Sequence, residues 1–286
     1  MISRFSQGLD GLRVEAGIYP ERLRQAIDDG WHTGDELPGS HGLGHVGAMK
    51  MISDGSLNTR SAYCSMPYSG IRPETYGTLS YAPEQIESYM RLAVEHGFDI
   101  ACHAIGDEAN TIVLDCAERT HAHGSIEHAQ MLKECDIPRL AQLGLVASIQ
   151  PQHAMDDRDV IARFWGTPAG IPYAFNSLHK AGTKLLMGSD APVAPLDPWL
   201  AISAAVFGTE SSDREPFQPE QCLDFETALA SSTAVGRVAL RDADAADLVL
   251  LDCDPSIIDS PEAMRAMPEH VLGTMLAGRW TYQQAE

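Results

Sequence analysis

The sequence is short of positive charge and of long apolar runs. Its 286 residues include 20 lysines and arginines against 40 aspartates and glutamates, a net charge of −20. This negative charge is spread along the chain, so nucleic acids and anionic membranes are not expected partners. No apolar stretch approaches a membrane span, and residues 1–17 lack the apolar core of a signal peptide. We therefore expect a cytoplasmic protein.

Several short motifs that would indicate other chemistries are also lacking. The six cysteines form no C-x-x-C pair, which is typical of reduced, mostly buried thiols: Cys64, Cys102, Cys116, Cys135, Cys222 and Cys253. No G-x-S-x-G nucleophile elbow is present. The segment GLGHVG at 42–47 matches G-x-G-x-x-G but precedes a predicted strand, so it does not indicate a dinucleotide site.

What the sequence does contain is an alternation of short β-rich runs and amphipathic helices. The predicted strands cover residues 12–19, 46–53, 98–104, 125–129, 145–151 and 183–190. Several of them read as apolar on both faces, as in a parallel sheet or barrel covered by helices. Six such units are fewer than the eight of a closed (β/α)₈ barrel. The pattern predicts an α/β, TIM-barrel-like fold that lacks the first barrel strands.

The pattern changes near the C-terminus. Residues 225–240 are predicted to form a helix, and 245–255 and 271–282 are predicted to be strands without long helices between them. We therefore expect two domains. Residues 1–223 would form the partial barrel with the catalytic site, and residues 224–286 the last helix and part of a small β-sandwich.

Three polar residues lie at the carboxyl ends of predicted strands, where α/β enzymes place their active sites: His103, His128 and Asp190. Imidazole and carboxylate groups are ligands of Zn²⁺ and related divalent ions. A single histidine at such a position is also compatible with a hydrogen-bonded structural residue. Three metal-binding side chains at equivalent positions on three predicted strands indicate a metal site.

Lys50 occupies the same relative position on an earlier predicted strand, within the apolar segment AMKMI. It is compatible with a lysine whose amine reaches water, or with a buried ion pair. The functional alternative begins with burial, which favours the neutral amine. A neutral amine can react with CO₂ to give a carbamate, whose oxygens can bridge two metal ions.

The segments MKMISDGSLN, CHAIGD, SIEHAQML and LMGSDAPVAPLDPWL resemble the amidohydrolase superfamily. Within it they are similar to the amidohydrolase-3 branch, which includes N-substituted formamide deformylases, from about residue 11 to the C-terminus. The resemblance implies a metal-dependent TIM barrel beside a small β-sandwich, with one or two divalent ions, of which zinc is the expected one.

The same resemblance implies roles for individual residues. Lys50 matches the carboxylated lysine, His103 and His128 the histidine ligands, and Asp190 the aspartate that binds metal and shuttles the proton. It also implies that Gln150 and His153 lie near the substrate.

Two aspartates follow predicted strands and are candidates for orienting the metal ligands. These are Asp54, in SDGS, and Asp107, in IGDE. Turn or helix-capping roles explain both equally well.

The chain departs from the family pattern in one respect. The family's His-x-His ligand pair follows the first barrel strand, whereas the only such pair here is His121 and His123, in a polar turn after a predicted helix. We expect those two residues, and also His41 and His45, to be loop residues.

The expected activity is hydrolysis of a non-peptide C–N bond in a small amide, such as an N-substituted formamide, through a metal-activated water. The alternative is a non-catalytic remnant, or a subunit that needs a partner to supply the His-x-His strand. Open strand edges favour a homo-oligomer or a complementing N-terminal segment.

Overall fold

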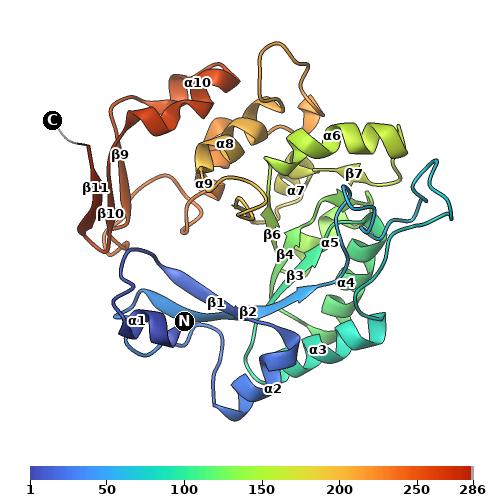
Figure 1. Cartoon of the computed structure of the whole chain (residues 1–286), viewed down its shortest axis with the longest axis horizontal. Helices are drawn as coiled ribbons and strands as arrows, with labels where there is room; N and C mark the ends of the chain where they lie inside the picture. Colours follow the sequence, from blue (N-terminus) through green and yellow to red (C-terminus); the bar gives the residue numbers. More distant parts are fainter. Residues whose placement is uncertain (285–286) are drawn as a thin grey trace. The chain divides into compact units, whose positions relative to one another are not determined.

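The computed structural model describes residues 1–284 and divides into two compact units (Figure 1). Unit 1 comprises residues 1–149 and 156–185, and unit 2 comprises residues 150–155 and 186 onward. The expected domain boundary at residue 223 remains a prediction.

A six-stranded sheet with the strand order β1-β2-β3-β4-β6-β8 is the framework of unit 1. The strands are β1 (Val14–Ile18), β2 (Gly44–Ile52), β3 (Ile100–Ala104), β4 (Gly124–His128), β6 (Val146–Ile149) and β8 (Leu185–Met187). The pairs from β1 to β6 are parallel. All six predicted strands are confirmed, and so is the prediction of a partial, TIM-barrel-like fold.

The helices alternate with most of the strands of the six-stranded sheet. They are α1 (Ile2–Ser6), α2 (Pro20–Asp28), α3 (Pro83–Glu95), α4 (Asp107–Thr120), α5 (Ile137–Gln142), α6 (His153–Phe164), α7 (Phe175–Lys180), α8 (Pro198–Phe207), α9 (Phe225–Ser231) and α10 (Pro261–Arg265), with short 3₁₀ turns η1 (Pro219–Gln221), η2 (Pro255–Ile257) and η3 (Met267–His270). Helix α1 precedes β1, and α8 to α10 follow β8. Helices α3 and α4 pack side by side. Among residues 1–284, no helix combines the length and the apolar character that crossing a membrane requires.

The two faces of the sheet differ, contrary to the expectation that the strands are apolar on both. One face is fully buried and apolar, with Met49, Met51, Cys102, Ile126 and Ala147. The residues that alternate with these are partly exposed, and many of them are polar. Side chains alternate along a strand, so the strand register decides which polar groups share the second face.

Unit 2 contains a small antiparallel sheet with the order β11-β10-β9. Its strands are β9 (Leu248–Leu251), β10 (Val271–Leu276) and β11 (Arg279–Gln283), and residues Ala277 and Gly278, both at positive φ, form the turn between the last two. The two strand predictions for this region are confirmed.

Two local features differ from the sequence expectations. The helix predicted over 225–240 is shorter, because α9 ends at Ser231 and the Thr233 hydroxyl then bonds to the backbone of Ala230 and Arg237. The structure also contains an unexpected antiparallel pair, β5 (Met131–Leu132) with β7 (Ile171–Pro172). Such short pairs depend on tertiary contacts and have no periodicity of their own.

A buried carboxylate joins the long loop after β2 to the rest of unit 1. Asp157, only 6% exposed, accepts hydrogen bonds from Asn58 Nδ2 at 2.9 Å, Gln130 Nε2 at 2.6 Å and the Tyr173 hydroxyl at 2.7 Å. All three donors are neutral, and burial with the adjacent Asp157 charge raises the pKa of Tyr173. Gln130 follows the end of β4, so this carboxylate also restrains the backbone that carries His128.

We predict that Asp157→Ala lowers the free energy of unfolding by about 3 kcal/mol, because the buried donors of Gln130 and Tyr173 lose their acceptor and the bond from the exposed Asn58 is also lost. Urea denaturation followed by circular dichroism measures this change. The control is Asp156→Ala, which removes an exposed carboxylate from the same helix and should change stability by less than about 0.5 kcal/mol. Equal effects of the two substitutions would contradict this role for Asp157.

Candidate metal centre

A row of polar side chains shares the partly exposed face of the six-stranded sheet. His103 pairs in register with Ile52 on one side and Glu127 on the other, and Lys50 lies two residues before Ile52. Parallel register and strand alternation therefore place Lys50, His103 and Glu127 on one face. Glu127 accepts hydrogen bonds from the hydroxyls of Ser125 at 2.5 Å and Ser148 at 2.8 Å.

His128 reaches this row through an unusual backbone conformation. Its register partner is Ala104, a residue of the buried face, so simple alternation would point His128 away from His103. His128 has φ 71° and the next residue, Ala129, has φ 42°. Such left-handed conformations are costly for residues other than glycine and occur often at functional sites. They end the strand and redirect the His128 side chain.

The two imidazole rings meet as a result. The ring centroids of His103 and His128 are 4.5 Å apart, with an angle of 74° between the ring planes. His128 is 7% exposed, and the His103 side chain is 14% exposed. Two nearly buried imidazoles in edge-to-face contact are a donor set that suits Zn²⁺ or a related divalent ion, so these residues fit the metal that the sequence predicted.

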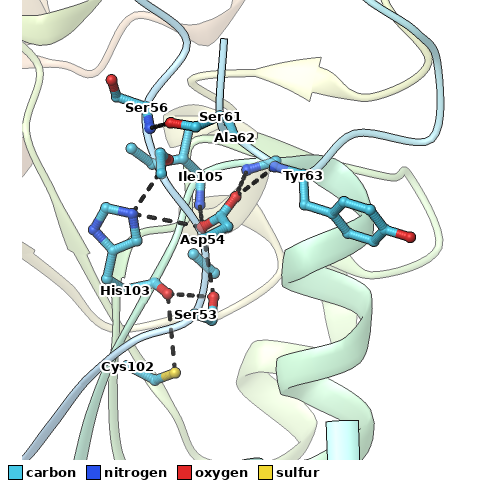
Figure 2. A network of polar contacts seen from close by, with 12 residues as sticks. Ser53, Asp54, Ser56, Ser61, Ala62, Tyr63, Cys102, His103 and Ile105 are labelled. Carbon is cyan, nitrogen blue, oxygen red and sulfur yellow. Dashed lines mark hydrogen bonds and ion pairs between the residues drawn. The ribbon is translucent and has the colours of Figure 1, made fainter. Parts of the chain in front are cut away.

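Asp54 follows the end of β2 and lies beside the His103 ring (Figure 2). Its side chain is 1% exposed and accepts three backbone N–H bonds, from Tyr63 at 2.9 Å, Ile105 at 3.1 Å and Gly106 at 2.9 Å. Burial raises the pKa of Asp54 to about 7, and the backbone N–H groups oppose that rise. The carboxylate thereby ties three separate segments of backbone together.

The Asp54 network also orients the His103 ring. His103 Nε2 lies 3.5 Å from Asp54 Oδ1 and 3.4 Å from the Gly55 carbonyl oxygen (Figure 2). Metal-binding histidines commonly point their second ring nitrogen at a carboxylate or carbonyl, which fixes the ring. With Nε2 directed at these oxygens, Nδ1 is the atom through which His103 would coordinate a metal.

Asp107 has a different role from Asp54 in the structure. It is the first residue of α4, is 1% exposed, and accepts bonds from the backbone N–H and the hydroxyl of Ser65. It therefore fastens the loop after β2 to the start of α4. A part for Asp107 in orienting metal ligands remains a prediction.

Lys50 is half-buried on β2, opposite Gly17 of the neighbouring strand. A Cβ added to Gly17 would lie 3.5 Å from the Cβ of Lys50, so the glycine leaves room beside the lysine. Burial raises the pKa of the Cys102 thiol, and the charge of Lys50 opposes that rise. Lys50 thus lies close enough to Cys102 for its charge to affect the thiol.

The remaining predicted site residues belong to unit 2. Gln150 is buried directly after β6, and His153 begins α6. A possible ligand atom of His153 and one of Asp190 lie within 4.8 Å of each other. Asp190 is exposed and adopts φ 54°, a second left-handed residue among the predicted ligands. Its predicted part in metal binding and proton transfer remains a prediction.

The histidines expected to be loop residues fall into two groups. His121 and His123 are exposed at the end of α4, as predicted, and His41 is an exposed turn residue. His45 is an exception, because β2 begins at Gly44 and includes it. The prediction that His45 is a loop residue is therefore wrong, since pairing with β1 extends the strand.

Sequence reasoning missed two residues of this region. Glu127 was overlooked although it alternates with Ser125 on a predicted strand, a pattern that could have indicated a polar face. Asn110 is completely buried, and its Nδ2 lies within hydrogen-bond distance of the carbonyls of Ala104, Gly106 and Met131 at 2.9–3.1 Å. It thereby links the end of β3 to the residues after β4, but its place in an α-helix gave no signal of this.

Comparison with known proteins identifies the family of this chain. Residues 11–282 match the model of the amidohydrolase family. The chain belongs to the amidohydrolase family. It is 32% identical over 256 residues to the protein LONG AFTER FAR-RED 3 of Arabidopsis thaliana, covering 83% of this chain and 43% of that protein. It is 29% identical over 289 residues to the putative amidohydrolase YtcJ of Bacillus subtilis strain 168, covering 94% of this chain and 54% of that protein.

A solved structure shares the fold of this amidohydrolase-family chain. It is an uncharacterized metal-dependent hydrolase from Pyrococcus horikoshii OT3, with a TM-score of 0.72 and 29% identity over 82% of this chain and 47% of that one. The chain thus spans about half the length of the relatives that it matches.

We predict that Asp54→Asn lowers the free energy of unfolding by about 2 kcal/mol. An asparagine side chain keeps one oxygen but places an NH₂ group against backbone N–H donors, so at least one donor loses its acceptor. Thermal and urea unfolding would measure the loss. The exposed Asp99, at the start of the neighbouring strand, provides the matched control Asp99→Asn, which should leave stability unchanged. An unchanged unfolding midpoint for Asp54→Asn would show that the carboxylate is dispensable.

Proposed function

We propose that this amidohydrolase-family chain contributes to a metal-dependent hydrolase that cleaves a non-peptide C–N bond in a small amide. The observation that carries the proposal is the meeting of His103 and His128 on the sheet face that also bears Lys50. The similarity to a protein described as a metal-dependent hydrolase supports a divalent ion, and zinc is our specific proposal. An N-substituted formamide is the proposed substrate type.

Lys50, His103, His128 and Asp190 are the proposed ligands of one or two ions. His103 and His128 would bind through imidazole nitrogens, with the His103 ring held by Asp54 and Gly55. Lys50 would contribute oxygen atoms after carboxylation by CO₂, a reaction that requires its neutral amine. Carboxylation would replace the cationic side chain with an anion, which favours metal binding.

The chain's own residues would carry the proton transfers. A bound divalent ion would supply a water of lowered pKa and polarise the substrate carbonyl. Asp190 would accept the proton of the attacking water and pass it to the leaving amine, first as general base and then as general acid. Gln150 and His153 would bind the substrate, a small amide.

The edge strand β1 of the six-stranded sheet offers a surface through which the chain could assemble with another strand. β1 is the first strand in the sheet order, and its outer backbone groups could pair with another strand. We propose that a second copy or a complementing N-terminal segment covers this edge. Light scattering of the purified chain, alone and with a co-expressed segment of a family relative, distinguishes these two arrangements.

We predict that His103→Ala and His128→Ala each weaken zinc binding at this centre at least tenfold and so lower the zinc content below that of the unsubstituted chain, because each removes an imidazole ligand. Elemental analysis of the dialysed protein measures the metal content. His123→Ala is the matched control, since this exposed histidine lies at the end of α4 and should leave the metal content unchanged. Equal metal in all three variants would contradict the proposed ligands.

We further predict that Asp190→Asn lowers kcat for an N-formyl amine by about 10²- to 10⁴-fold, because the proton carrier is lost. Lys50→Ala should lower both metal content and kcat. A dipeptide serves as the comparison substrate, and faster cleavage of the dipeptide than of the formamide would overturn the non-peptide assignment. A chain that binds no metal and cleaves neither substrate would instead support the alternative of a non-catalytic remnant or an incomplete subunit.

A further inference from the structure

A second group of metal-binding side chains lies at one end of the small antiparallel sheet in unit 2. Asp252 and Cys253 directly follow β9, and His270 directly precedes β10. The two strands pair through Val271 and Leu251, and the Asp252 N–H donates to the His270 carbonyl at 3.1 Å. The backbone of two adjacent strands therefore holds all three side chains at the same end of the sheet.

The donor atoms of these residues are already close together. One carboxylate oxygen, one sulfur and one ring nitrogen lie within 4.8 Å of one another, and Asp252 Oδ1 is 2.8 Å from His270 Nδ1. Tetrahedral Zn²⁺ with such ligands holds its donors about 3.3–3.8 Å apart. Small side-chain rotations would therefore bring the three donor atoms to the distances that a tetrahedral ion requires. The side chains of His270 and Asp252 are 44% and 46% exposed, so an ion can enter from solvent.

A fourth side chain, that of Met267, strengthens the preference for a thiophilic ion. The Sδ atom of Met267, a fully buried residue, lies 3.8 Å from Cys253 Sγ. Two sulfur ligands at about 2.3 Å from a tetrahedral ion are separated by about 3.8 Å. Sulfur donors select thiophilic metals over Mg²⁺ or Ca²⁺, and one thiolate with one carboxylate would neutralise the charge of a divalent ion.

We propose that Asp252, Cys253 and His270 bind a Zn²⁺ ion, with the Met267 sulfur beside the fourth coordination position. Binding transfers the thiol proton of Cys253 to solvent and forms the Zn–S bond. The ion joins the segment after β9 to the segment before β10, so its role is to stabilise this end of the sheet. The site shares no residue with the proposed metal centre.

Co²⁺ titration of the metal-stripped full-length chain tests the site, because Co²⁺ bound to a thiolate gives a ligand-to-metal charge-transfer band that histidine and carboxylate ligands do not give. The expected result is a band whose final intensity corresponds to one thiolate-bound Co²⁺ per chain and which disappears on addition of Zn²⁺. The band should vanish in Cys253→Ser, and the affinity should fall at least tenfold in His270→Gln. It should persist in Cys135→Ser, which removes an exposed cysteine elsewhere.

A second measurement keeps the test independent of the cobalt spectrum. Zn²⁺ should slow alkylation of Cys253 by iodoacetamide at least tenfold, measured by peptide mass spectrometry, and leave the rate at Cys135 unchanged. Circular dichroism of the metal-free variants confirms that they are folded. Absence of the band, its survival in Cys253→Ser, or equal alkylation with and without Zn²⁺ would overturn the proposal. None of these readouts depends on hydrolytic activity. The proposed zinc site can therefore be supported or overturned whether or not the proposed function is correct.

Discussion

The carboxylate of Asp54 is the interaction on which the candidate centre depends. It joins the end of β2, the loop at Tyr63 and the start of α4 through three backbone N–H bonds. Two of these donors, Ile105 and Gly106, directly precede the first residue of α4, where the helix dipole also favours negative charge. The same carboxylate faces His103 Nε2. The Asp54 side chain that holds these backbone segments together therefore also sets the orientation of a proposed metal ligand.

The centre combines ordinary strand geometry with local strain. Alternation and register are enough to place Lys50, His103 and Glu127 on one face. His128 needs left-handed backbone, a conformation that costs about 1–2 kcal/mol for a residue with a side chain. Asn110 and Gln130 hold the backbone just beyond it, so tertiary hydrogen bonds offset a conformation that the sequence does not favour locally.

The difference between regular strand geometry and backbone held by tertiary contacts explains which features the sequence could predict. Periodicity predicted the six strands, and the position of His103 and His128 at strand ends followed from the topology of parallel sheets. The alternation of Ser125 and Glu127 was visible in the sequence, but the register that places Glu127 on one face with Lys50 and His103 was not. The Asn110 and Asp157 networks join residues distant in the chain, such as Asn58 with Asp157, so no local pattern could reveal them. The end of α9 was misplaced because side-chain bonds from Thr233 compete with the helix.

The scarcity of basic residues shapes how unit 1 accommodates its buried acids. With 20 basic against 40 acidic residues, few cations are available as partners. Asp54 and Asp157 accept hydrogen bonds from neutral donors, namely backbone N–H, amide and phenol groups, whereas the buried Asp136 is paired with Arg139. A chain with this net charge repels itself, and a bound divalent cation reduces that repulsion wherever its ligands are anionic. Metal ions at the proposed sites would then stabilise the folded state as well as supply chemistry, because a ligand that binds only the folded chain shifts the folding equilibrium.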